Sequence, residues 1–154
     1  MNSKLRAAAA LAALIASAAP AHADWEGTTW GMSPEAALAA LDGATPHTPD
    51  AAELFDYGGA SYSPLVKLSH PLDGIEGDVS LLFDADEALQ FVVFVPSDIA
   101  DCDELSTALT QRHGATEATG FGSIAIYNWE ENGDIIRFTN SVDSGICNLS
   151  YGPV

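Results

Sequence analysis

Residues 78–95 read DVSLLFDADEALQFVVFV, and this stretch decides the fold because it predicts two adjacent strands joined by a short acidic turn. In the first strand, residues 79, 81 and 83 are apolar and share one face. In the second strand, residues 91, 93 and 95 share one face and residues 92 and 94 the other, and all five are apolar. A strand that is apolar on both faces is typical of the centre of a sheet. We therefore expect a β-hairpin at the middle of the fold.

Further strands are expected on both sides of this hairpin. Downstream, three short strands cover about residues 123–129, 134–139 and 145–151, and Asn132-Gly133 is a strong signal for a type I′ turn between the first two. Upstream, residues 43–77 are rich in Pro, Gly, Ser and Asp and predict only one or two irregular strands, including residues 65–69.

Two helices are also expected. The first begins at Ser33-Pro34-Glu35, which offers an N-cap hydroxyl, a proline at the first helical position and an acid in the first turn. The second covers residues 101–113, where acids stand in the first turn and Arg112 in the last. The chain thus predicts an α+β fold, an antiparallel β-sheet with two helices packed on one face. The order of elements also fits two helix-plus-β-meander units, residues 24–95 and 97–154.

The N-terminal segment predicts export. Two basic residues, Lys4 and Arg6, precede an apolar run from Ala7 to about Ala16, and Ala21-His22-Ala23 closes the segment, which is the order of a cleavable signal peptide. We expect residues 1–23 to be removed between Ala23 and Asp24, leaving a single domain of residues 24–154. The apolar run is shorter than the about 20 residues that span a bilayer, so no membrane anchor is expected after cleavage. The predicted location is periplasmic or secreted.

The charge of the chain excludes several partners. The sequence has 22 acidic and five basic residues, a formal net charge of −17, which becomes −19 without Lys4 and Arg6. Phosphate backbones and anionic lipid surfaces would repel such a protein, so neither a nucleic acid nor a membrane surface is expected as a partner. The acidity is explained by solubility and hydration, or alternatively by a basic protein partner or Ca²⁺.

The two cysteines, Cys102 and Cys147, are expected to form a disulfide because secreted proteins fold in oxidising compartments. The alternatives are a redox pair or a soft-metal site. Redox pairs usually have a Cys-x-x-Cys arrangement, whereas these two cysteines are far apart in the sequence. The histidines at 47, 70 and 113 stand singly and supply no metal-ligand spacing.

Other candidate chemistry has a structural interpretation in each case. The turn Asp84-Ala85-Asp86-Glu87 has the carboxylates that Ca²⁺ prefers, but it lacks the glycine and glutamate positions of a helix-loop-helix site. The segment Gly120-Phe121-Gly122-Ser123 departs from the Gly-x-Ser-x-Gly pattern of a nucleophile elbow after the serine, and its glycines are expected to form a turn before a strand. A second group of acids stands at the start of the second helix, where acids are expected for structural reasons; its members are Asp98, Asp101, Asp103 and Glu104. The three tryptophans, Trp25, Trp30 and Trp129, are expected in the core rather than in a binding surface. No catalytic, cofactor-binding or metal-binding residue is assigned.

Two segments, Trp30-Gly31-Met32-Ser33-Pro34-Glu35 and Cys147-Asn148-Leu149-Ser150-Tyr151, resemble a group of small exported bacterial proteins of unassigned function. Members share a signal peptide, a Trp-Gly-Met-Ser opening to the first helix and a late cysteine before a tyrosine. The resemblance implies a fold and no activity. The expected architecture is also similar to that of small secreted inhibitor or protein-binding domains, an analogy of fold only.

The sequence alone therefore favours a soluble exported binding or interaction protein without enzymatic activity, whose partner is unknown. Two alternatives remain open. One is a hydrolase or metal-dependent enzyme whose site is assembled from residues far apart in the sequence, and the other is a Ca²⁺-binding or salt-adapted structural protein.

Overall fold

The computed structural model describes residues 25–154, so the predicted signal segment and the cleavage point between Ala23 and Asp24 lie outside the described residues. Within this range nine strands form one sheet, in which every pairing is antiparallel. The strands are β1 (Thr45–Pro46), β2 (Phe55–Tyr57), β3 (Ala60–Ser69), β4 (Gly77–Phe83), β5 (Leu89–Pro96), β6 (Thr119–Phe121), β7 (Ile124–Glu131), β8 (Asp134–Ser141) and β9 (Ile146–Pro153).

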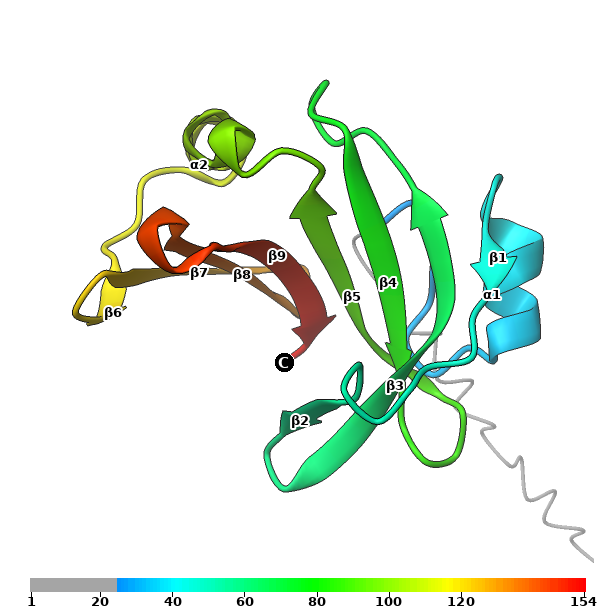
Figure 1. Cartoon of the computed structure of the whole chain (residues 1–154). Helices are drawn as coiled ribbons and strands as arrows, with labels where there is room; N and C mark the ends of the chain where they lie inside the picture. Colours follow the sequence, from blue (N-terminus) through cyan, green and yellow to red (C-terminus); the bar gives the residue numbers. More distant parts are fainter. Residues whose placement is uncertain (1–24) are drawn as a thin grey trace, which may run out of the picture.

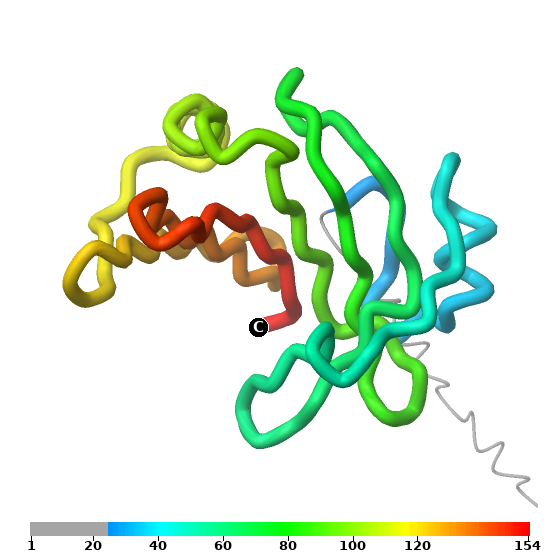
Figure 2. The backbone as a smooth tube through the Cα atoms, viewed as in Figure 1, coloured from blue at the N-terminus to red at the C-terminus, as the bar shows by residue number. Residues whose placement is uncertain are grey.

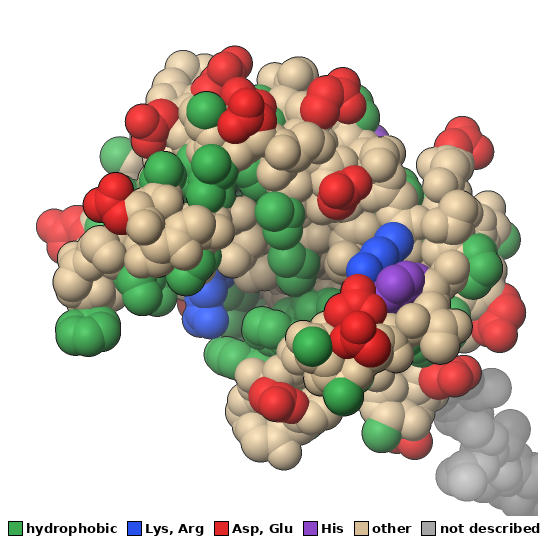
Figure 3. All heavy atoms as spheres, viewed as in Figure 1, with side chains coloured by type: hydrophobic (Ala, Val, Ile, Leu, Met, Phe, Trp, Pro, Cys, Tyr) green, Lys and Arg blue, Asp and Glu red, His purple; other side chains and the backbone are tan. Residues whose placement is uncertain are grey.

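The strand order is β1-β3-β4-β5-β9-β8-β7-β6, and β2 pairs with β3 outside this path. The central contact is between β5 and β9, where Val93 lies opposite Ser150. The sheet bends at this contact, so that β3–β5 lie on one side and β7–β9 on the other (Figures 1 and 2). The space-filling view shows a hollow between the two sides (Figure 3). The position of β5 in the middle of the sheet confirms the prediction drawn from its two apolar faces.

Both predicted hairpin turns are confirmed. Between β4 and β5 the chain reverses at Asp84, whose backbone N–H donates to the carbonyl of Ala88 at 3.0 Å. Between β7 and β8 it reverses at Asn132 and Gly133, with φ angles of 53° and 90°. A type I′ turn requires positive φ at both central positions, which asparagine and glycine tolerate best.

Two short helices complete the described part: α1 (Pro34–Ala40) and α2 (Cys102–His113), with 3₁₀ turns η1 (Ile99–Asp101) and η2 (Val142–Ser144). The Oγ of Ser33 accepts from the N–H of Ala36 at 3.3 Å and caps α1, as the sequence predicts. No helix among the described residues is long and apolar enough to cross a membrane.

The expected fold class, an α+β sheet with two helices packed on one face in two helix-plus-meander units, is wrong. The fold is mainly β. Residues 43–77, predicted to hold one or two irregular strands, form three strands, of which β3 with ten residues is the longest in the sheet. The helices have only seven and 12 residues, about 10 and 18 Å, which is too short to cover such a sheet.

The hydrophobic core is therefore built mainly by strands. Helix α1 buries only Ala37, and α2 buries Cys102, Leu105 and Leu109. Most other core side chains come from one face of the strands. Their fully buried members include Val66, Val79, Leu81, Phe83, Leu89, Val92, Phe94, Ile136, Phe138 and Leu149. The opposite face of the sheet, which borders the hollow, carries mostly half-buried and exposed side chains, although Leu82, opposite Phe91, is buried there.

Candidate functional site: a pocket on the hollow face of the sheet

A pocket of about 130 Å³ opens on the hollow face, and we call it the concave pocket. Its lining residues are Phe55, Tyr57, Phe91, Val93, Ile135, Arg137, Ser150, Gly152 and Pro153. Figure 3 shows hydrophobic side chains gathered in the hollow of this face, beneath a rim with acidic residues. The site thus combines residues from β2, β5, β8 and β9, which are far apart in the sequence.

Strand register places the floor of the pocket. Ser150 on β9 lies opposite Val93 on one neighbour and opposite Arg137 on the other. Two residues further along β9, Gly152 lies opposite Ile135. Because adjacent strands are about 4.8 Å apart, these side chains form a continuous surface across three strands. The alternation of each strand then sends the intervening residues, such as Val92 and Ile136, into the core.

Three aromatic rings, those of Phe55, Tyr57 and Phe91, form one wall of the pocket, and Tyr62 packs against Phe91. The Phe91 ring is surrounded by three others, with centroid separations of 6.0 Å to Phe55, 5.8 Å to Tyr57 and 4.9 Å to Tyr62, each close to edge-to-face. Edge-to-face packing is a favourable geometry for aromatic pairs. Two of the rings remain open to solvent, because Phe55 is 42% exposed and Tyr57 is 47% exposed.

Arg137 is the cationic group of the pocket. Its Nε donates to Oδ1 of Asn128 at 3.0 Å, which orients the guanidinium, and its Cζ lies 5.8 Å from the centroid of the Tyr57 ring. The other basic residues of the described part are both paired with acids, Lys67 with Glu53 and Arg112 with Asp73. Arg137 has no carboxylate within 4.0 Å among residues 25–154. In so acidic a chain, a cation kept free of carboxylates is an unusual arrangement.

A charged network beside the pocket holds the segment that leads into β2. Glu53 Oε1 lies 2.6 Å from Lys67 Nζ on β3, both carboxylate oxygens lie 3.0 Å from His47 Nε2, and Oε2 accepts from the backbone N–H of Asp50 at 3.1 Å. The Lys67 hydrogen bond is the main reason that the pKa of Glu53 is lowered to about 2, followed by the Asp50 N–H and His47. The network fixes residues 47–53 against β3 and so positions Phe55 and Tyr57.

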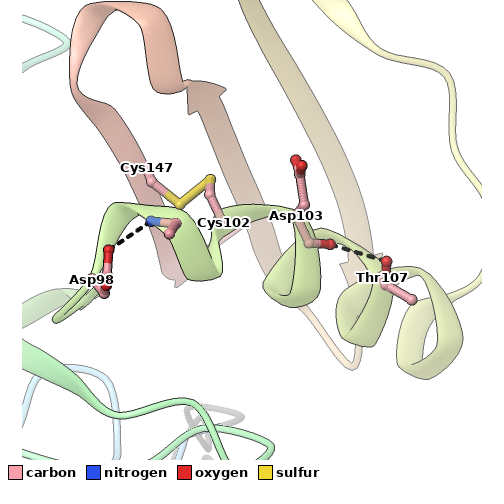
Figure 4. Close-up of a disulfide and its surroundings, with 6 residues drawn as sticks. Asp98, Cys102, Asp103, Thr107 and Cys147 are labelled. Atoms are coloured by element: carbon pink, nitrogen blue, oxygen red, sulfur yellow. Dashed lines mark hydrogen bonds between the residues drawn. A yellow bond between two sulfur atoms is a disulfide. The ribbon is translucent and has the colours of Figure 1, made fainter.

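The two predicted disulfide residues lie together. Cys102 at the start of α2 and Cys147 on β9 are at disulfide distance, with Cα atoms 6.0 Å apart (Figure 4). The acidic residues near the two cysteines stabilise the starts of η1 and α2. Asp98 Oδ1 accepts from the N–H of Ala100 at 2.9 Å and caps η1, while Asp103 is in the first turn of α2. The pair therefore joins the start of α2 to the central part of the sheet.

The acidic turn 84–87 is a structural element. Asp84 Oδ1 accepts from the N–H groups of Asp86 and Ala88, each at 3.0 Å, and Oδ2 accepts from Gln90 Nε2 at 2.8 Å. These bonds use the carboxylate to close the β4–β5 turn. In the part of the chain that the structure describes, no group of three or more His, Cys, Asp or Glu side chains is placed to hold a metal ion.

The remaining sequence candidates are not among the residues that line the pocket. The histidines each contact a different glutamate, His47 with Glu53, His70 with Glu26 and His113 with Glu131. Ser123 Oγ lies 3.3 Å from Ser141 Oγ. The prediction that the tryptophans belong to the core is confirmed for Trp25 and Trp129, and Trp30 packs against the core.

The residues of the concave pocket were missed by the sequence interpretation. Phe55 and Tyr57 lie in the segment predicted to be irregular, and an arginine on a strand gives no motif. One feature of the sequence could have indicated Arg137: within five positions along the chain its only acidic neighbour is Asp134.

Comparisons with protein families, with curated proteins and with solved structures found no match to the chain. The resemblance to small exported bacterial proteins therefore stays a prediction. The function has to be inferred from the geometry of the concave pocket.

Proposed function

We propose that the protein is an exported, non-enzymatic binding protein whose concave pocket holds a ring-sized apolar group. The observation that carries this proposal is the pair of half-exposed rings, Phe55 and Tyr57, on a wall otherwise formed by packed aromatics. Covering their exposed parts would contribute about 1 kcal/mol for each ring. A solvent-exposed aromatic wall beside a cavity is typical of a recognition site.

The size of the pocket limits what it takes. Its volume of about 130 Å³ is below the roughly 300–1,000 Å³ of sites that enclose drug-sized molecules. A single aromatic ring or a branched aliphatic group is the appropriate occupant. The strands below the pocket are rigidly paired, so little ordering of the floor is needed on binding.

A binding role fits the lining better than catalysis does. The polar side chains among the lining residues are those of Tyr57, Arg137 and Ser150, and the lining includes no histidine or carboxylate. Ser150 Oγ is directed to the backbone carbonyl of Arg137 at 3.5 Å. A hydroxyl without an adjacent base is a weak nucleophile. We therefore assign no reaction to the pocket, and the expectation of a basic protein partner stays a prediction.

The experiment that tests the proposal is a titration of ¹³C-methyl-labelled protein with a panel of ring-sized compounds that are neutral, anionic or cationic. We expect at least one of them to shift the methyl signals of Val93 and Ile135 and to leave distant core methyls such as Leu105 unchanged. If no compound in the panel moves the pocket signals, the proposal is wrong.

Two variants sharpen this test. Replacing both exposed rings, Phe55→Ala with Tyr57→Ala, removes much of the wall and should weaken binding at least about tenfold. The matched control is Phe121→Ala on β6, because Phe121 is 85% exposed and does not line the pocket. Equal affinity in both variants would show that the compounds bind elsewhere.

A further inference from the structure

We propose that the ligand of the concave pocket is a small apolar monocarboxylic acid whose carboxylate is bound by Arg137. This inference rests on the proposed function and goes beyond it by naming the chemical class of the ligand. The evidence for this inference is the charge of the pocket, whereas the evidence for the proposed function is the aromatic wall.

The first step is the hydrogen-bonding capacity of Arg137. A guanidinium has five N–H donors, and here Nε is the one that donates to a protein group, Asn128. Neither terminal nitrogen donates to an acceptor among residues 25–154. These nitrogens can form the two parallel bonds that a carboxylate accepts from arginine.

The second step is the sign of the ligand's charge. At a distance the net charge of −17 attracts cations, but salt at physiological strength screens fields beyond about 8 Å. Inside the pocket the nearest charge is the guanidinium of Arg137. A ligand ammonium would be repelled there, while a carboxylate would form a charge-assisted hydrogen bond.

The third step is the number of charges. Arg137 is the one basic residue among the lining residues, and the pocket contains no helix N-terminus. One guanidinium balances one negative charge. A phosphate dianion would carry an unbalanced charge into an acidic protein, so a monoanion is the better match.

The fourth step is the spacing between charge and ring. The Cζ of Arg137 lies 5.8 Å from the centroid of Tyr57, and Val93 and Ile135 complete the apolar floor. A ligand that contacts both parts has its carboxylate within a few bonds of its apolar group. Aryl and branched alkyl acids of the size of 3-phenylpropionate meet this requirement and the volume of the pocket.

The test is a calorimetric and NMR titration with 3-phenylpropionate, using the neutral 3-phenylpropanamide as the matched ligand. We expect the acid to bind at least about tenfold more tightly than the amide. Arg137→Met should remove this preference, and Arg137→Lys should retain part of it because lysine keeps the charge but not the planar pair of donors. The methyl spectrum of each variant shows whether it is folded, and the acid-amide pair on the wild-type protein needs no variant.

The outcomes are distinguishable. If acid and amide bind equally and Arg137→Met changes neither, the inference is wrong while the proposed function holds. If neither ligand shifts the pocket signals and no other compound of the panel does so, the proposed function fails. A third arm uses the peptide acetyl-Gly-Gly-Phe, which carries the same carboxylate and ring at a chain terminus. Binding of this peptide more than tenfold tighter than 3-phenylpropionate would overturn a small free acid as the ligand.

Discussion

The ring of Phe91 lies directly against the backbone of Gly152, so closely that a Cβ on residue 152 would be only 2.6 Å from Cδ1 of the ring. Real Cβ atoms do not approach a ring carbon to this distance. The glycine at position 152 therefore lets the Phe91 ring lie against the backbone of β9, where it forms part of the aromatic wall of the concave pocket. Phe91 in turn supports the three aromatic rings around it.

Replacing Gly152 with alanine should push the Phe91 ring toward the hollow and fill part of the pocket. We expect Gly152→Ala to abolish binding of ring-sized compounds and to destabilise the fold by about 1–3 kcal/mol through overpacking. Denaturant unfolding and the methyl titration measure the two effects. Asn148→Ala on the same strand is the control, because residue 148 is outside the pocket and should change neither. Unaltered binding by Gly152→Ala would show that the ring position is not needed.

Removing the cysteine pair should lower stability more than any surface substitution. Cys102 and Cys147 are 45 residues apart, so the chain-entropy model assigns about 4 kcal/mol to closing this loop. We expect the Cys102→Ala, Cys147→Ala double variant to unfold at a clearly lower denaturant concentration, and the oxidised wild type to lose a similar amount on reduction. A midpoint that is unchanged by reductant would mean that the two sulfurs are not bonded in solution.

The sequence was most informative where structure depends on neighbouring residues. The turn at Asn132-Gly133 and the cap at Ser33 were predicted because each depends on the φ angles or hydrogen bonds of a few consecutive residues. The fold class was not, because β3 is fixed mainly by long-range pairing with β4 and carries Pro64 at an irregularity in the register. A proline and polar residues in that stretch suggested a loop, and tertiary contacts outweighed this local preference.

The candidate site was still harder to predict, because it exists only once the sheet has bent. Phe91 was placed on the correct strand, yet its position beside Arg137 depends on the pairing of β5 with β9 and of β9 with β8. Nothing in the separation of residues 91 and 137 along the chain indicates that both line one pocket. Phe55 and Tyr57 are positioned differently, by the local pairing of β2 with β3, where Phe55 lies opposite Tyr62 and Tyr57 opposite Ala60. Their segment of the sequence had no clear period.

A partly buried hydrogen bond joins the first described segment to the β7–β8 hairpin. Trp30 Nε1 donates to Oδ1 of Asp134 at 2.6 Å, and Asp134 is only 1% exposed. Because hydrogen bonds to a buried carboxylate are strong, a double-mutant cycle with Trp30→Phe and Asp134→Ala, each of which removes the bond, should give a coupling free energy of about 1.5–3 kcal/mol. Denaturant unfolding of the wild type and the three variants measures it. Strictly additive losses would contradict a direct coupling between the two side chains.

The Glu53 network predicts how stability changes in acid. The pKa of Glu53 is lowered from 4.5 to about 2 in the folded protein, chiefly by Lys67, so folding favours the ionised carboxylate. This contribution is fully present above about pH 4.5 and is lost as the pH falls toward 2. Glu53→Gln should therefore be less stable than the wild type at pH 7, and the difference between the two should disappear between about pH 4.5 and 2.

The same variant connects the network to the pocket. Because Glu53 holds residues 47–53 against Lys67, Glu53→Gln should loosen Phe55 and Tyr57 and weaken binding of ring-sized compounds at pH 7. Glu117→Gln is the control, since Glu117 is exposed and makes no contact with the network. If Glu53→Gln and Glu117→Gln show the same pH profile and the same affinity, the network neither stabilises the fold in acid nor positions the aromatic wall.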